Sequence, residues 1–182
     1  MSPVRASKKT RDITYIALFA VLMAVCSWIS VPTAVPFTMQ TFAVFLAFCL
    51  LGGRRAALSI LVYLLMGAVG LPVFSNFTGG LGCLLNVTGG YLVGFLLCAL
   101  LMWLMETLLG GGTRAKIASM AVGLLACYAF GTVWFMVVYA RTTAAIGIGA
   151  ALIMCVVPYI IPDLVKLSLA VLLSKRLSPL IK

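Results

Sequence analysis

The chain has no histidine and only three acidic residues among its 182 positions: Asp12, Glu106 and Asp163. Six cysteines are present, but none form a Cys-x-x-Cys pair. Five of the six fall inside apolar runs, where a free cysteine behaves as a small hydrophobic residue. Without histidine or paired cysteines, the sequence argues against a zinc or haem site. We therefore expect no bound metal and no resident cofactor.

Motifs for catalysis and for nucleotide hydrolysis are also missing. The sequence has no Gly-Lys-Ser or Gly-Lys-Thr, so it cannot form a Walker phosphate loop. It has no serine–histidine, cysteine–histidine or paired-carboxylate set, which leaves few residues for general acid–base chemistry. The sequence therefore disfavours an enzyme and excludes ATP hydrolysis by that loop.

Charge itself is scarce in this chain. It is 64% hydrophobic and 9% charged, whereas soluble domains carry about 25% charged residues. The composition predicts an integral membrane protein of the lipid bilayer, and helices of about 20 residues each leave room for six spans. No internal repeat or low-complexity tract divides the sequence. We expect a single all-α membrane domain over residues 1–182.

The apolar runs mark six expected membrane-spanning helices, at residues 13–31, 37–53, 56–71, 89–108, 117–139 and 148–174. Pro32 and Pro36 bracket the first connection, and three consecutive glycines beginning at Gly110 mark the turn after the fourth helix. The segment 72–88 contains several Gly, Asn and Thr residues, and we expect it to be a loop too broken to form a helix.

The basic residues are divided unevenly between the two ends of these helices. Eleven of the thirteen lie in the N-terminal segment, the second and fourth connections and the C-terminal tail. Arg141 alone falls at the opposite end, and Lys166 lies inside the last apolar run. Despite the net charge of +10, this grouping follows the positive-inside rule and not a nucleic-acid-binding surface. It predicts cytoplasmic termini, with the connections 32–37 and 72–88 outside.

Asp163 and Lys166 are the only charges in residues 148–173. A spacing of three places them on one helical face. An isolated charge at the centre of a membrane costs about 2.5–3.5 kcal/mol on insertion scales, so such a pair indicates a functional site. Pro158 and Pro162 lie just upstream, and we expect them to kink the helix and free carbonyl groups for a small ligand. The alternative is an ion pair that only locks this helix to a neighbour.

Three weaker patterns add candidates. Thr78 and the Gly-Gly pairs of the 72–88 segment, with Asn86, Gly89, Gly90 and Tyr91 before and within the fourth helix, could offer backbone N–H groups to a ligand or only pack tightly. Gln40, the single glutamine, lies near the start of the second helix and could contact a ligand or the neighbouring loop. Ala20 and Ala24, four residues apart, form a small-residue face suited to helix association, or to ordinary packing.

Taken in order, these segments resemble one family. The pieces that match are Val35-Pro36-Phe37-Thr38-Met39-Gln40-Thr41, Gly70-Leu71-Pro72-Val73-Phe74, Gly79-Gly80-Leu81-Gly82, Thr88-Gly89-Gly90-Tyr91-Leu92-Val93-Gly94-Phe95 and Pro162-Asp163-Leu164-Val165-Lys166. They resemble the biotin-specific BioY family of S components, the substrate-binding subunits of energy-coupling-factor (ECF) vitamin transporters, over about residues 12–176. One departure lies before the fourth helix, where the family usually has Gly-Pro-Thr/Ser-Gly-Gly-Tyr and this chain has Val87 in place of the proline.

The resemblance implies a six-helix S-component fold in a prokaryotic plasma membrane and high-affinity capture of biotin from outside. It implies that Asp163 accepts a hydrogen bond from a ureido N–H and that Lys166 donates to a polar acceptor. Thr78 would contact the ligand from the outer loop. The face of Ala20 and Ala24 would meet the transmembrane coupling protein, which two ATPase subunits drive.

Two other interpretations stay open at the level of sequence. An S component for another vitamin, such as thiamin or riboflavin, would bring aromatic binding motifs that are not assembled here. A small intramembrane enzyme or a structural subunit is the second alternative. The missing catalytic set counts against the enzyme, and the Asp163–Lys166 pair counts mildly against a purely structural role.

Overall fold

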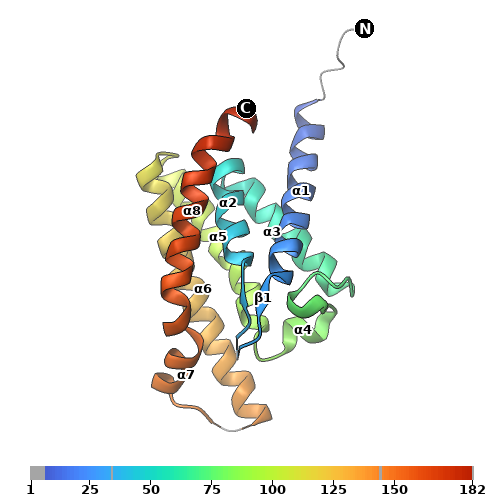
Figure 1. Cartoon of the computed structure of the whole chain (residues 1–182), viewed down its shortest axis with the longest axis vertical. Helices are drawn as coiled ribbons and strands as arrows, with labels where there is room; N and C mark the ends of the chain where they lie inside the picture. The colour runs from blue at the N-terminus through green and yellow to red at the C-terminus, as the bar shows by residue number, and fades with distance from the viewer. Residues whose placement is uncertain (1–6, 34, 144, 182) are drawn as a thin grey trace.

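The computed structural model describes residues 7–33, 35–143 and 145–181. Its long helices pack in two layers (Figure 1). One layer holds α1 (Lys8–Trp28), α2 (Gln40–Leu51) and α8 (Val157–Ile181), and the other holds α3 (Gly53–Ala68), α5 (Gly89–Leu109) and α6 (Thr113–Thr142). The short elements gather at one end of the bundle: the antiparallel strands β1 (Ser30–Val31) and β2 (Phe37–Thr38), the 3-10 turn η1 (Ser75–Phe77), α4 (Leu81–Leu85) and α7 (Ile148–Cys155).

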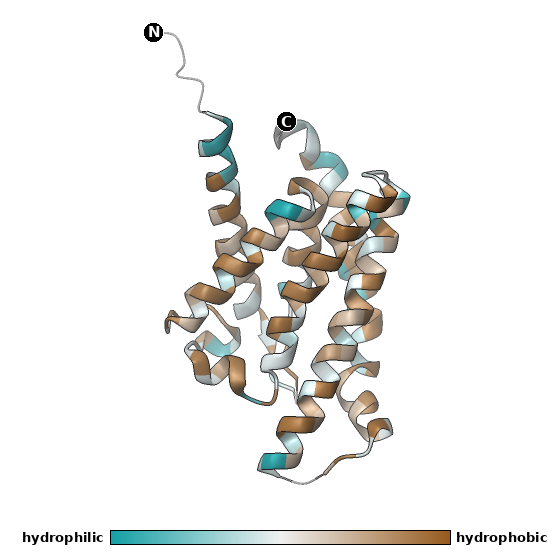
Figure 2. Ribbon diagram, turned by 180° about the vertical axis from the view of Figure 1, so that it is seen from behind, coloured by the Kyte–Doolittle hydropathy of each residue, from teal (hydrophilic) through white to brown (hydrophobic). Residues whose placement is uncertain are grey.

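The helices carry the surface of a membrane protein. Among the described residues, four stretches are long and apolar enough to cross a bilayer: α1, α5, α6 and the α7–α8 stretch Ile148–Pro179. Large apolar side chains point outward along them, among them Ile161 at 76% exposure and Leu125 at 65%. Hydrophilic colours collect near the helix ends in Figure 2, while the long middle of the bundle is hydrophobic. Burying this surface from water requires lipid, so the expectation of an integral membrane protein is confirmed.

The short helix α2 forms the centre of the core. Ten of its twelve residues are buried, and it lies between α1 and α8 in Figure 1. A helix that is apolar all round is stable only when neighbours cover every face. At 1.5 Å per residue α2 is only about 18 Å long, which brings its first residues into the interior of the bundle, beside α8.

The corner between α2 and α3 depends on glycine and on one carboxylate. Gly52 has φ +81°, a left-handed conformation that favours glycine. A Cβ on Gly53 would lie 2.4 Å from the Trp103 Cα, so α3 and α5 approach too closely for any side chain there. Glu106 of α5 accepts a 2.6 Å hydrogen bond from the Gly53 N–H. This carboxylate satisfies one of the unpaired donors at the start of α3.

Several predicted boundaries need correction. The first helix ends at Trp28, because Ser30 and Val31 pair with β2 instead of continuing the helix predicted to residue 31. The segment 72–88, predicted to lack a helix, contains α4, whose Leu81–Leu85 run is apolar enough to form one turn. The single helix predicted over 148–174 is divided at Val156 (φ −125°, ψ −55°). Pro158 sits in the first turn of α8, where its missing N–H has no consequence, and Pro162 lies within the helix.

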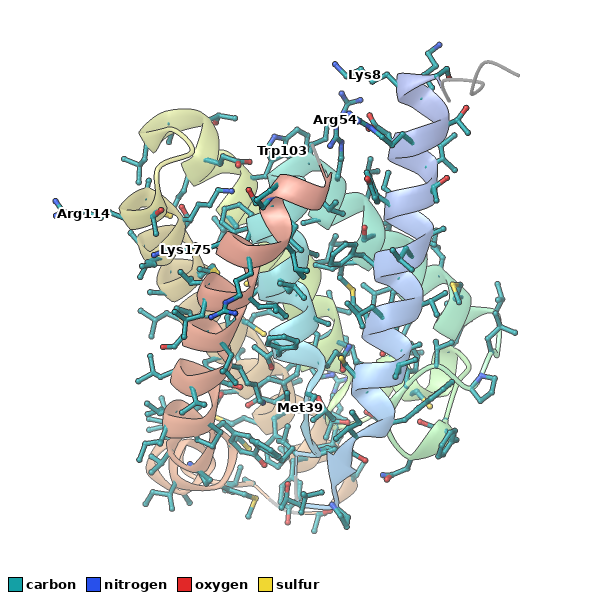
Figure 3. All side chains as sticks on the ribbon, turned by 45° about the horizontal axis from the view of Figure 1, so that its top comes forward. Lys8, Met39, Arg54, Trp103, Arg114 and Lys175 are labelled. Atoms are coloured by element: carbon teal, nitrogen blue, oxygen red, sulfur yellow. The ribbon has the colours of Figure 1, made fainter. Side chains whose placement is uncertain are left out.

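Basic residues collect at the end of the bundle opposite the short elements. Figure 3 shows Lys8, Arg54, Arg114 and Lys175 there, on four different helices. The described start of α1 and the last turns of α8 lie at this same end (Figure 1). The first described turn of α1 and the last described turns of α8 therefore share the basic end of the bundle.

Candidate functional site

The two charges singled out in the sequence form a buried ion pair on α8. The Lys166 Nζ lies 2.8 Å from Asp163 Oδ1, and each residue is 4% exposed. An ion pair this far from water needs further hydrogen bonds to offset its desolvation. The structure supplies them from two other elements of the bundle.

The β-hairpin provides the additional partners of Lys166. The ammonium donates a 2.7 Å hydrogen bond to the Thr38 carbonyl and lies 4.1 Å from the centroid of the Phe37 ring. Both residues belong to β2, which ends immediately before α2 begins. An ammonium group has three donors, and here the carboxylate, the carbonyl and the aromatic face receive them.

Helix α6 provides the second partner of Asp163. The Tyr128 hydroxyl donates to Asp163 Oδ2 at 2.5 Å. Each carboxylate oxygen therefore accepts one strong hydrogen bond, the first from Lys166 and the second from Tyr128. A carboxylate has about four acceptor positions, so Asp163 keeps capacity to receive donors from a ligand.

A second tyrosine fastens the hairpin to α8. The Tyr159 hydroxyl donates to the Val35 carbonyl and lies 2.9 Å from the Thr33 hydroxyl. Its ring stacks on Phe37 with centroids 6.2 Å apart. The connection between α1 and α2 is therefore held over the first turns of α8 by side-chain and backbone contacts together.

These groups border one cavity with an empty volume of about 660 Å³, part of it open to the outside. The walls come from the hairpin, η1 and helices α2, α5, α6, α7 and α8: Val35, Pro36, Thr38, Gln40, Thr41, Ser75, Thr88, Tyr91, Leu92, Phe95, Leu124, Cys127, Tyr128, Cys155, Tyr159, Asp163 and Lys166. Apolar atoms form most of the surface, and of the polar lining residues Lys166 and Tyr128 bond directly to Asp163.

Two further predicted site residues reach this cavity. Gln40, 3% exposed, lines it at the start of α2, and its side chain also interacts with the hydroxyl of Tyr63. Tyr91 lines it from α5, and its hydroxyl lies 3.0 Å from the Thr132 hydroxyl. Together with the ion pair, four of the residues predicted as substrate-binding are brought into one place.

The other four do not line the cavity. Thr78 donates to the Ser75 carbonyl at 2.8 Å in its own turn. Asn86 accepts from the Thr88 backbone N–H at 2.9 Å, and its carbonyl accepts from the Trp134 indole at 3.0 Å. These contacts shape the loop instead of facing the cavity.

The glycine pair before α5 serves close packing. A Cβ on Gly89 would lie 2.0 Å from the Leu84 carbonyl oxygen, and one on Gly90 would lie 2.3 Å from the Trp134 Cβ. Glycine is therefore needed here because α4 and α6 approach the backbone of α5, which favours the packing alternative raised from the sequence.

Ala20 and Ala24 are also placed differently from the expectation. They are 0% and 3% exposed, because α1 turns this face toward α2 and α3 inside the bundle. Small residues let these helices approach closely. The structure thus does not present the two alanines to a partner protein.

Sequence reasoning missed Tyr128, Tyr159 and the Thr38 carbonyl. A tyrosine inside an apolar run carries a hydroxyl that needs a hydrogen-bond partner when it is buried. This signal was present in the sequence and could have identified both tyrosines. The Thr38 carbonyl left no signal in the sequence, because every residue has the same backbone carbonyl to offer.

The architecture matches that of a known class of membrane protein. A solved structure described as the S-component for biotin from an ECF-type ABC transporter superimposes with a TM-score of 0.82, covering 95% of this chain and 94% of that one at 22% identity. At this level of identity the likeness establishes the fold. The predicted S-component fold is therefore confirmed, while the count of six membrane-spanning helices stays a prediction.

The sequence matches the model of the BioY family over residues 2–182, and the chain belongs to this family. The "Probable biotin transporter BioY" of Pyrococcus horikoshii is 36% identical over 170 residues, which cover 93% of this chain and 97% of that protein. The "Biotin transporter BioY" of Thermotoga maritima is 38% identical over 171 residues, with the same coverage. Membership places the chain among transporter components and not among enzymes.

Proposed function

We propose that this chain is the biotin-binding S component of an ECF transporter. Two lines of support converge: membership of a family whose relatives are named biotin transporters, and a cavity in which the Asp163 carboxylate is held by two donors while keeping free acceptor positions. The second is the observation that carries the proposal, because it gives the site a chemistry that a purely structural pair does not need.

Biotin fits this chemistry. Its ureido ring has two N–H donors beside one strong carbonyl acceptor, and its thioether ring and valeryl chain are apolar. A ureido N–H would donate to the unused lone pairs of Asp163, and Leu92, Phe95 and Leu124 would contact the apolar parts. Among the predicted residues, Gln40 is the one whose amide NH₂ group would donate a hydrogen bond to the ureido carbonyl.

In this proposal the two charges have different tasks. Lys166 has its three donors directed to Asp163, Thr38 and the Phe37 ring. To contact biotin it would have to release one of these partners. In this proposal Asp163 therefore contacts the ligand directly, and Lys166 holds the carboxylate in place through their 2.8 Å hydrogen bond.

The orientation follows from charge. The basic end of the bundle would face the cytoplasm of a prokaryotic cell, and the end with the hairpin, η1 and α4 would face outside. Six crossings would then be made by α1, α2, α3, α5, α6 and the α7–α8 stretch, within a single membrane domain. A coupling protein and two ATPase subunits would supply the energy for uptake.

Binding can be tested directly on the purified protein. The experiment identifies small molecules that co-purify in detergent by mass spectrometry and then titrates biotin by calorimetry. We expect saturable binding below micromolar concentration, weaker binding of a biotin analogue with a methylated ureido nitrogen, and none of thiamin or riboflavin. No heat of binding with biotin at micromolar concentrations would refute the proposal, and binding of another vitamin would redirect it.

A further inference from the structure

A second pocket lies at the opposite, basic end of the bundle. It has an empty volume of about 480 Å³ and lies between the first turn of α6, the glycine turn before it and the last turns of α8. Its walls are Cys49, Gly111, Thr113, Lys116, Val171, Ser174, Lys175 and Ser178. None of these residues borders the ligand cavity around Asp163.

The chemistry of this pocket is that of an anion site. Two lysines and three hydroxyl-bearing residues line it, and no carboxylate does so among the described residues. The chain has only three acidic residues, and those at this end are engaged elsewhere: Asp12 lies 3.0 Å from Arg55, and Glu106 accepts from the start of α3. Among the described residues, no carboxylate is therefore offered to the two lysines.

One of the lysines is held in place. Lys116 is half-buried and its Nζ donates to the Cys49 carbonyl at 2.8 Å. That bond takes one of its three donors, and the side chain still lines the pocket. Lys175 and Ser178 approach from α8, separated by one turn on the same face. Ser174, 9% exposed, also lines the pocket, but its hydroxyl donates to the Val171 carbonyl at 2.8 Å, so the hydroxyl donors left for a ligand are those of Thr113 and Ser178.

We propose that this pocket binds a phosphate group, carried by the headgroup of an anionic membrane lipid or present as free phosphate. A lysine pair with hydroxyl groups matches the charge and the acceptor oxygens of phosphate. The lipid is the favoured source, because the pocket lies at the end of the helices where basic residues meet the headgroups. Val171 adds an apolar side chain to the lining of the pocket.

Native mass spectrometry of the detergent-purified chain can test this proposal, with phosphatidylglycerol and phosphatidylethanolamine as lipid probes. We expect phosphatidylglycerol to bind more tightly than the zwitterionic lipid. Lys175→Gln and Lys116→Gln should each weaken phosphatidylglycerol binding about fivefold, the usual effect of one lysine near a membrane surface. Arg114→Gln is the matched control, since Arg114 lies two residues from Lys116 but outside the pocket.

The arms of the experiment separate the possible outcomes. If inorganic phosphate at millimolar concentration displaces phosphatidylglycerol, the pocket accepts free phosphate too; if only the lipid binds, the headgroup is the ligand. Equal losses in Arg114→Gln and Lys175→Gln would overturn the proposal in favour of diffuse attraction, as would equal binding of both lipids. Lys175 is exposed and makes no hydrogen bond recorded among the described residues, so its variant should fold even if Lys116→Gln does not.

Discussion

Replacing Asp163 by asparagine isolates the charge of the proposed biotin site while keeping its shape. The carboxylate accepts from Lys166 at 2.8 Å through one oxygen and from Tyr128 at 2.5 Å through the other. Asparagine has a single oxygen, so in either orientation one of these donors faces an NH₂ group. The variant also leaves Lys166, 4% exposed, without its counter-ion.

The expected magnitudes follow from these contacts. Hydrogen bonds to a charged group contribute about 1.5–3 kcal/mol, which corresponds to biotin binding roughly 10- to 150-fold weaker once the ureido N–H loses its anionic acceptor. Removing one partner of a buried ion pair costs about 3–5 kcal/mol of stability. We therefore expect Asp163→Asn to lower both biotin affinity by calorimetry and the thermal unfolding temperature.

A second variant separates the two effects. Adding Lys166→Met to Asp163→Asn removes the unpaired buried ammonium, so stability should recover while biotin binding stays weak. Asp12→Asn is the control, because Asp12 also pairs with a cation, Arg55 at 3.0 Å, but both side chains are about 30% exposed. Such surface pairs contribute about 0–1 kcal/mol. Full biotin affinity in folded Asp163→Asn would refute the ligand role and leave the pair as a structural lock.

Three further changes test other parts of the structure. Tyr128→Phe removes one donor from Asp163, and we expect calorimetry to give biotin binding about 10-fold weaker with little change in unfolding temperature. Gly131→Ala places a methyl group 2.3 Å from the Tyr91 ring, and overpacking of this kind should cost about 1–3 kcal/mol in thermal unfolding and weaken binding. Glu106→Ala leaves the start of α3 uncapped, which should cost about 0.5–2 kcal/mol of stability while biotin affinity is unchanged.

Each of these has a control or a contrary result. For Gly131→Ala the control is Gly149→Ala, where an added Cβ meets nothing within 4 Å. A Tyr128→Phe variant that unfolds as easily as Asp163→Asn would contradict its assignment as a positioning residue. We expect no effect of Glu106→Ala on biotin affinity, because Glu106 does not line the cavity. Loss of biotin binding in this variant would contradict that expectation and show that the α2–α3 corner influences the cavity.

The long helices were predictable because crossing lipid demands a continuous apolar run, and that demand leaves a direct trace in the sequence. Their ends were not, since they depend on contacts between distant residues. The α2–α3 corner is fixed by Glu106, 53 positions after Gly53. Likewise, Ser30 and Val31 leave the helix because β2 is available to pair with them. Local composition cannot encode such partners.

The site likewise combines contacts between residues close in sequence, which could be predicted, with contacts between distant residues, which could not. Asp163 and Lys166 are three residues apart on one helix, so periodicity alone brought them together. Tyr128 and Thr38 lie 35 and 128 positions from their partners and meet them only in the folded bundle. The glycines near the cavity could not be interpreted from sequence. A Gly-Gly motif reads the same whether it makes room for a ligand or for a neighbouring helix, and at Gly90 the neighbour is Trp134 of α6.

The contacts around the ion pair also bear on how a ligand would be released. Lys166 bridges α8 to β2 through the Thr38 carbonyl, and Tyr159 bridges the same helix to Val35. Both Val35 and Thr38 line the cavity. A movement of α8 that frees the carboxylate from its ligand would therefore pull on the hairpin that covers it. In this arrangement the carboxylate that we propose holds biotin and the hairpin that lines the cavity are coupled through Lys166, so loss of that side chain should speed biotin dissociation more than it slows association.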